Sequence, residues 1–169
     1  IVPMDFEIIF GRRKSFEVEI DDLKIPFAGA IDRMDKYIDE DKYIIIDYKN
    51  SDYNIRNIDH MRSGLSLQLP LYILSQMDKT IVGALYGIIS TGEFQLKIGN
   101  VEEKDLVSKR NKGAITEEEL EELLNTTKNY IKSYIESIHK GDFSVNPMEC
   151  SPYCIYKDIC RYKEVWEVE

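Results

Sequence analysis

Three charged side chains occur where the sequence otherwise predicts buried strands. Asp47 and Lys49 are two residues apart in the apolar run 43–49, so their side chains emerge on one face of a strand. Charges in such a strand need a partner or a function, because burying them unpaired is costly. Asp32 lies one predicted strand earlier and could pair alongside. Two carboxylates and a lysine that converge at a strand end would suit Mg²⁺, which prefers few carboxylates, water and a substrate phosphate.

A plainer interpretation of these charges stays open. An Asp-x-Lys triplet is a weak signal alone, and Asp47 with Lys49 could simply mark the fraying end of a strand. Asp35 is the alternative to Asp32 as the first carboxylate. It lies three residues further on, so it faces away from Asp32 in a strand, and we expect it in a turn or a salt bridge.

Gln68 and Tyr72 form a second pair of interest. They are four residues apart and therefore share one face of a helix. One interpretation places Tyr72 in the core and Gln68 at its boundary. The other points both side chains at the metal site, where they would position a phosphate or a water.

All three cysteines lie in the last twenty residues, at Cys150, Cys154 and Cys160. Their odd number and tight clustering argue against a secreted disulfide framework and favour ligation or redox chemistry in a reducing compartment. A zinc site with a fourth outside ligand and plain reduced thiols both remain open.

The elements that must position these residues follow from periodicity. Alternating and β-branched runs predict six strands, of which the first two and the last two form hairpins and the fourth is central and buried on both faces. They cover 4–10, 15–20, 25–37, 43–49, 81–90 and 93–98. A polar, mobile loop is predicted over 50–62.

Two helices complete the pattern. Helical spacing predicts one over 63–77, in which Pro70 indicates either a first turn near 67–70 or a kink. The second begins at Thr116, where Thr116 and Glu119 match a capping box, and ends at Gly141. Its apolar stripe runs from Leu120 to Ile138.

Composition limits the function classes. The 169 residues are 43% hydrophobic and 31% charged, which is ordinary for one globular domain. The longest apolar stretch, 81–89, is too short to span a bilayer, and the first residues carry no signal-peptide pattern, so we expect a cytoplasmic protein without membrane contact. The net charge of −9 means that any nucleic-acid function must rest on a local site or on a partner. The chain does not begin with Met, which suggests a piece of a longer protein.

The motifs Gly29-x-Ile31-Asp32-Arg33-x-Asp35, Ile46-Asp47-Tyr48-Lys49 and Leu67-Gln68-Leu69-Pro70-Leu71-Tyr72 together resemble the nuclease domain of the RecB/AddB type. This is a branch of the PD-(D/E)xK superfamily, and the resemblance runs from about Phe6 to the C-terminus. It implies an α/β fold of the restriction-endonuclease-like kind, with a mixed central β-sheet flanked by helices. Residues 1–145 would be the nuclease core and 146–169 a cysteine-containing tail of the same domain.

The same resemblance implies roles for the residues. Asp32 and Asp47 would be metal ligands with the backbone carbonyl of Tyr48, and Lys49 would polarise the attacking water or the scissile phosphate. Gln68 and Tyr72 would match the family's helical motif. The implied activity is Mg²⁺-dependent (or Mn²⁺-dependent) cleavage of DNA, with an exonuclease expected, in the nuclease part of a helicase–nuclease that processes double-strand breaks. DNA and a helicase subunit or domain would be the partners.

The cysteine tail resembles the terminal cysteine group of the iron–sulfur-bearing members. That resemblance implies that Cys150, Cys154 and Cys160 bind a cluster in the intact protein, and that this chain holds it incompletely, because the family's upstream cysteine and metal-binding histidine have no match in the sequence. His60 and His139 are expected at the surface. The alternatives are a stand-alone or CRISPR-adaptation-type nuclease and an inactive DNA-binding module of the same fold.

Overall fold

The computed structural model describes residues 1–12, 16–21, 23–53, 55–103, 106, 113–144, 153–156 and 159–160. The chain divides into two compact units, Ile1–Lys132 and Ser133–Glu169. The elements are β1 (Val2–Phe10), β2 (Phe16–Ile20), β3 (Leu23–Phe27), β4 (Gly29–Lys36), β5 (Lys42–Lys49), α1 (Ile58–Arg62), α2 (Gln68–Leu74), β6 (Thr80–Ile88), β7 (Glu93–Asn100), β8 (Ala114–Ile115) and α3 (Glu117–Lys140).

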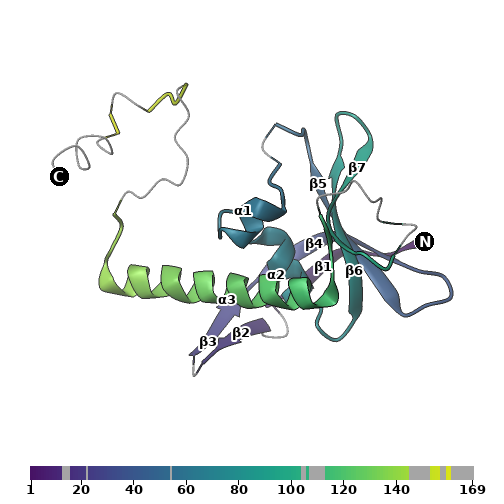
Figure 1. Ribbon diagram of the computed structural model, residues 1–169, viewed down its shortest axis with the longest axis horizontal. Coiled ribbons are helices and arrows are strands. Elements are labelled where there is room, and N and C mark those ends of the chain that lie inside the picture. The colour runs from purple at the N-terminus through teal and green to yellow at the C-terminus, as the bar shows by residue number, and fades with distance from the viewer. Residues whose placement is uncertain are drawn as a thin grey trace. The chain divides into compact units, whose positions relative to one another are not determined.

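A mixed six-stranded sheet organises the first unit, in the order β1-β4-β5-β6-β7-β8 (Figure 1). β5 pairs antiparallel with β4 and parallel with β6. Residues 43–47 of β5 are all buried, because this strand lies inside the sheet and is covered on both faces. The mixed sheet with helices confirms the expected fold class.

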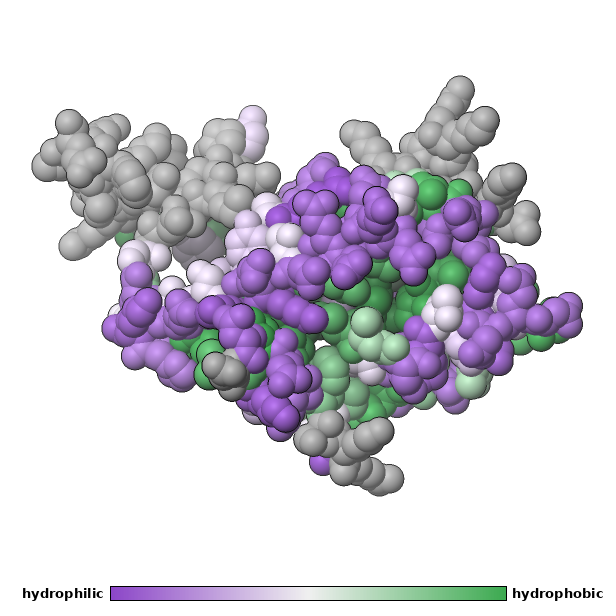
Figure 2. Space-filling view, turned by 60° about the horizontal axis from the view of Figure 1, so that its bottom comes forward, coloured by the Kyte–Doolittle hydropathy of each residue, from purple (hydrophilic) through white to green (hydrophobic). Residues whose placement is uncertain are grey.

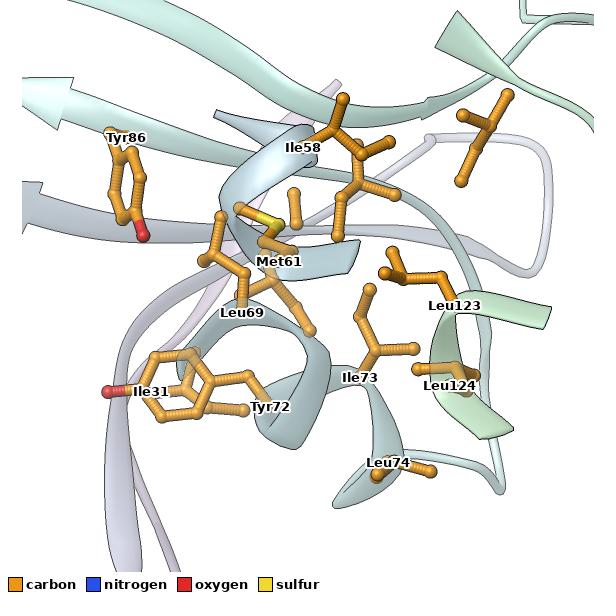
Figure 3. Packing of buried hydrophobic residues seen from close by; sticks show 14 of the residues in the cluster. Ile31, Ile58, Met61, Leu69, Tyr72, Ile73, Leu74, Tyr86, Leu123 and Leu124 are labelled. Carbon is orange, nitrogen blue, oxygen red and sulfur yellow. The ribbon is translucent and has the colours of Figure 1, made fainter. Parts of the chain in front are cut away.

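The main hydrophobic core lies between the sheet and the helices. Side chains of α2 and α3, among them Leu69, Ile73, Leu123 and Leu124, pack together with α1 and with Ile45 of β5 (Figure 3). A smaller cluster, containing Ile44, Ile46, Val82 and Leu85, lies on the reverse face of the sheet. The helices therefore cover one face of β5, which is the face that Asp47 and Lys49 share with Ile45.

The predicted hairpin between the first two strands is wrong. β1 pairs with β4, and β2 pairs with β3 in a separate two-stranded sheet. The β2–β3 hairpin is an insertion between β1 and β4. The residues that flank it, Phe10 and Gly29, are paired with each other in the β1–β4 ladder. Gly11 permits this, because a Cβ there would lie 1.8 Å from the carbonyl oxygen of Phe27.

Two further expectations need correction, and one strand was not expected. The strand predicted over 25–37 is two strands, β3 and β4, separated at Ala28. The loop predicted over 50–62 contains α1, whose N-cap Asn57 exchanges hydrogen bonds with His60. Short β8 has no sequence signal, because two residues are too few to show a period.

The long helix begins and ends as predicted. The Thr116 backbone N–H donates to Glu119 (2.9 Å), and the Glu119 N–H donates to Thr116 Oγ1 (3.2 Å). α3 ends at Lys140, and Gly141 adopts a φ of 67°. The apolar stripe is buried only in part, since Ile131 is 3% exposed whereas Ile138 is 57% exposed.

Hydrophilic side chains predominate on the face drawn in Figure 2, with hydrophobic ones exposed between them. Among the described residues, no helix is both long and apolar enough to cross a membrane.

Candidate active site

The two carboxylates singled out in the sequence lie side by side on neighbouring antiparallel strands. Arg33 of β4 pairs with Ile46 of β5, which places Asp32 and Asp47 one position further along the same ladder. Asp47 is only 2% exposed, and Asp32 is half-buried. Oδ2 of Asp32 accepts a hydrogen bond of 2.7 Å from the backbone N–H of Tyr48. The Asp32 side chain thereby reaches across to the backbone that follows Asp47.

Lys49 lies on the same side of β5 as Asp47. Its Nζ is 2.6 Å from Oδ2 of Asp47 and lies 5.3 Å from the ring centroid of Tyr86. Tyr86 is opposite Asp47 in the parallel β5–β6 ladder. The ring forms an apolar wall under the ammonium group and contributes a cation–π attraction. Tyr86 has no sequence signal for this place, because only the strand register reveals that it faces the lysine.

Gln68 connects these charges to helix α2. Its Oε1 accepts a hydrogen bond from Lys49 Nζ (2.8 Å), and its Nε2 donates to Oδ1 of Asp47 (2.7 Å) and to the hydroxyl of Tyr72 (2.9 Å). The Tyr72 hydroxyl in turn donates to the same Asp47 oxygen at 3.4 Å. Gln68 and Tyr72 both reach Asp47, while the Tyr72 ring is buried in the core, so each interpretation holds in part. Their role at a metal site stays a prediction.

The position of Pro70 explains why the helix begins here. α2 begins at Gln68, so Pro70 lies in the first turn, where a backbone N–H would have no partner within the helix. This start places Gln68 and Tyr72 one turn apart on the face toward β5. The ring of Tyr72 lies within the core cluster beside Leu69 and Ile31 (Figure 3). Its hydroxyl reaches the Asp47 carboxylate.

The electrostatics of the site centre on Asp47. Burial raises the pKa of its carboxyl, and the charge of Asp32 raises it further, while Lys49 opposes both effects. Burial also raises the pKa of the Tyr72 and Tyr86 hydroxyls, so both stay neutral donors near pH 7. The site therefore holds negative charge that a nearby cation stabilises.

The donor set fits a hard divalent cation. Oδ2 of Asp47 is buried, and the Lys49 ammonium lies 2.6 Å from it. Asp32, one ladder position away, adds a second carboxylate, and the Tyr48 carbonyl is a third oxygen in the same stretch. No group of three or more histidine, cysteine, aspartate or glutamate side chains gathers among the described residues. A site with two carboxylates and a carbonyl suits Mg²⁺, which keeps several waters, better than an all-protein cage.

Asp35 belongs to a salt bridge, as expected. Its carboxylate is 2.6 Å from Nε of Arg33 and is 6% exposed. Arg33 also donates to the Tyr48 hydroxyl (3.0 Å). No sequence pattern indicates that these three side chains meet, because they come from two strands.

The remaining predicted residues lie away from these carboxylates in the sequence. Cys154 is half-buried and Cys160 is exposed, and both are free thiols; Cys150 lies outside the described residues. The backbone N–H of Cys160 donates to the carbonyl of Tyr156 (2.8 Å), which closes a turn. The cluster assignment of the cysteines stays a prediction. His139 is exposed as expected, and His60 is half-buried in its helix cap.

Comparison with known proteins decides the family. The model of the PD-(D/E)XK nuclease superfamily matches residues 1–161. The chain belongs to this superfamily. Its nucleases generally use divalent metals, which agrees with the donor set described above.

Two curated relatives are much larger proteins. Each is named as one of the subunits of an ATP-dependent helicase/deoxyribonuclease. The protein from Carboxydothermus hydrogenoformans is 36% identical over 104 residues, which is 58% of this chain and 9% of the relative. The protein from a Thermoanaerobacter species is 29% identical over 100 residues, or 56% of this chain and 8% of the relative. The chain thus matches less than a tenth of either relative's length.

Proposed function

We propose that this PD-(D/E)XK domain is a metal-dependent deoxyribonuclease, and that it is the nuclease part of a helicase–nuclease acting in double-strand-break repair. The observation that carries the proposal is the bonded network in which Gln68 joins Lys49, Asp47 and Tyr72. A dead domain of the same fold has no need to keep a lysine and a buried carboxylate in register.

Each residue then has a chemical task. Asp32, Asp47 and the Tyr48 carbonyl would hold Mg²⁺ or Mn²⁺. When bound, the metal would supply Lewis-acid chemistry, neutralising charge on the scissile phosphate and lowering the pKa of a water. Lys49 Nζ is a fixed cation on the same face, and it stabilises the charge that develops on the phosphate or steers the water.

Gln68 and Tyr72 act by orientation. Gln68 accepts from the Lys49 ammonium and donates to Asp47, so one amide fixes the spacing between the cation and the ligand. The neutral Tyr72 hydroxyl accepts from the amide of Gln68 and donates to Oδ1 of Asp47. With Oδ1 held by these two donors, the oxygen proposed to meet the metal is Oδ2 of Asp47, which contacts the Lys49 ammonium at 2.6 Å.

The relatives support the proposed context. They are named as helicase/deoxyribonuclease subunits, so a helicase partner and DNA substrate are proposed for this chain too. A partner that delivers DNA also explains how a domain with a net charge of −9 could act on a polyanion. We propose the boundary between nuclease core and cysteine tail near residue 145.

The cysteine tail forms a separate part of the proposal. Cys150, Cys154 and Cys160 would bind an iron–sulfur cluster in the intact protein. Metal analysis with visible absorbance of the anaerobically purified intact protein tests this: iron with sulfide supports the cluster, whereas zinc, or no bound metal, contradicts it.

The decisive experiment measures cleavage of linear single-stranded and double-stranded DNA with Mg²⁺, Mn²⁺ or EDTA. We expect cleavage with either metal, none with EDTA, and none by Asp47→Asn. Lys36→Ala is the matched control, because Lys36 is on β4 but pairs with Asp41 at the surface. A circular single strand separates exonuclease from endonuclease action, with no cleavage expected. Wild-type protein that binds DNA but never cuts it would favour the inactive module.

A further inference from the structure

The residues that follow the two candidate ligands point to the opposite side of the sheet. Side chains alternate along a strand, so Arg33 and Tyr48 emerge on the reverse face from Asp32 and Asp47. There the Arg33 guanidinium donates to the Tyr48 hydroxyl at 3.0 Å. This bond joins β4 to β5 directly beside the two candidate ligands, on the other side of the sheet.

The third member of this group, Asp35, fixes the guanidinium. Nε and Nη2 of Arg33 donate to its two oxygens at 2.6 and 2.7 Å, a two-pronged arrangement that defines the plane of the guanidinium. The Asp35 carboxylate holds the pKa of Arg33 above its usual range, so the guanidinium stays charged. Its central carbon also lies 5.9 Å from the ring centroid of Phe6 on β1. We call Arg33, Asp35 and Tyr48 the reverse-face clamp.

Packing restrains the ring of Tyr48 in addition to the hydrogen bond at its hydroxyl. It lies against Gly87 of β6, where an added Cβ would be 2.7 Å from Cδ1 of the Tyr48 ring and 3.2 Å from Phe94. Only a residue without a side chain lets the ring lie in this place. The hydroxyl and the ring are therefore both restrained, which leaves the Tyr48 backbone little freedom.

That backbone belongs to the candidate metal site. The Tyr48 N–H donates to Oδ2 of Asp32 at 2.7 Å, and its carbonyl is the proposed third ligand. We propose that the reverse-face clamp positions the metal ligands by holding Tyr48, an inference that rests on the proposed function. Arg33, Asp35 and the Tyr48 side chain act through the backbone and are positioning residues.

The test removes only the hydroxyl, with Tyr48→Phe, because the ring remains packed on Gly87. Arg33→Met is less suitable, since it would leave Asp35 buried without a partner. The matched control is Tyr43→Phe, which removes a tyrosine hydroxyl bonded to Asp41 (2.7 Å) at the other end of β5. A second variant, Gly87→Ala, keeps the Tyr48 hydroxyl but pushes the ring out of its place with the added Cβ.

Two readouts are measured on purified protein. Mn²⁺ binding, followed by the electron paramagnetic resonance signal of the free ion, needs no turnover. Cleavage kinetics give the Mg²⁺ concentration for half-maximal rate and the KM for DNA. We expect Tyr48→Phe and Gly87→Ala to weaken Mn²⁺ binding about tenfold and to raise the Mg²⁺ requirement similarly, with KM for DNA near wild type. Tm should stay near wild type in Tyr48→Phe and fall in Gly87→Ala, whose added Cβ must push the Tyr48 ring away. Tyr43→Phe should leave both metal readouts unchanged.

The outcomes separate the clamp from the proposed function. Weaker Mn²⁺ binding by Tyr48→Phe supports the clamp even if wild-type protein cuts no DNA, a result that would count against the nuclease proposal alone. Wild-type Mn²⁺ affinity in Tyr48→Phe, or an equal loss in Tyr43→Phe, overturns the clamp even in an active nuclease. Wild-type protein that binds no Mn²⁺ overturns both.

Discussion

At the scale of single residues, Asp47 is subject to two opposed effects. Burial disfavours its charged form, whereas Lys49, Gln68 and Tyr72 stabilise that form with an ion pair and hydrogen bonds. A carboxylate in this position binds a cation strongly because little water competes for it. Lys49, Gln68 and Tyr72 therefore help to determine whether Asp47 is charged and available to a cation.

Lys49→Ala should lower the rate of DNA cleavage at least about a hundredfold, because it removes the only cation bonded to both Asp47 and Gln68 among the described residues. Mn²⁺ binding should persist, since the carboxylates remain. Steady-state kinetics with Mn²⁺ titration check both points, with Lys36→Ala as control. Cleavage by Lys49→Ala at a near-normal rate would remove the lysine from the mechanism.

Tyr72→Phe should have a milder effect. It loses the hydroxyl bonded to Gln68 and Asp47 but keeps the ring in the core, so we expect about a fivefold loss in kcat and little change in Tm. Gln68→Ala should lose more, since Gln68 bonds three partners. A larger loss from Tyr72→Phe than from Gln68→Ala would contradict this order.

At the scale of elements, the start of α3 depends on one reciprocal pair. Thr116→Ala removes the side chain that accepts from the Glu119 N–H, and it should lower the free energy of unfolding by about 1 kcal/mol. Urea denaturation measures the change. Asn125→Ala, an exposed change within the same helix, should leave stability equal or slightly higher. Equal stability of Thr116→Ala and wild type would show that the cap does not hold the helix.

Strand β7 contains a β-bulge, and the lysine at this bulge makes stability depend on pH. Lys97 is the extra residue between the pairs Leu85↔Leu96 and Ala84↔Ile98, and burial lowers its pKa. The unfolded chain therefore binds the Lys97 proton more tightly, and this residue's contribution to stability rises with pH between the lowered and the ordinary pKa. Lys97→Met removes that dependence.

We accordingly expect the stability of Lys97→Met relative to wild type to be highest at pH 7 and to decline toward pH 10. Urea denaturation at the two pH values gives the difference. Lys36→Met is the control: the Asp41 carboxylate and Tyr43 raise the pKa of Lys36 above its ordinary value of 10.5, so its contribution to stability should be nearly equal at these two pH values. A relative stability of Lys97→Met that grows with pH would contradict the sign.

At the scale of the whole molecule, charge opposes the proposed substrate. With 22 basic and 31 acidic side chains, the chain should bind DNA weakly without a partner. We expect a Kd for a fluorescent single-stranded oligonucleotide no tighter than about 1 μM near physiological salt, with EDTA present to prevent cleavage. Fluorescence anisotropy measures it, and nanomolar binding would show that a local basic surface suffices.

The local geometry of the site can be predicted from the residue order alone. Period two places Asp47 and Lys49 on one face of β5, period 3.6 places Gln68 and Tyr72 on one face of α2, and Pro70 sets the start of that helix. The capping box of α3 is equally local. These features depend on residues within four positions of each other, so backbone geometry alone specifies them.

Which elements meet is visible only in the folded chain. There β1 pairs with β4 instead of β2, Gln68 lies against Lys49 across 19 positions, and Arg33 is joined to Tyr48 across 15. A strand's period identifies its faces but not its neighbour, because the choice of partner depends on the burial and backbone pairing of the whole sheet. The network around Asp47 therefore exists only once β4, β5 and α2 have packed together.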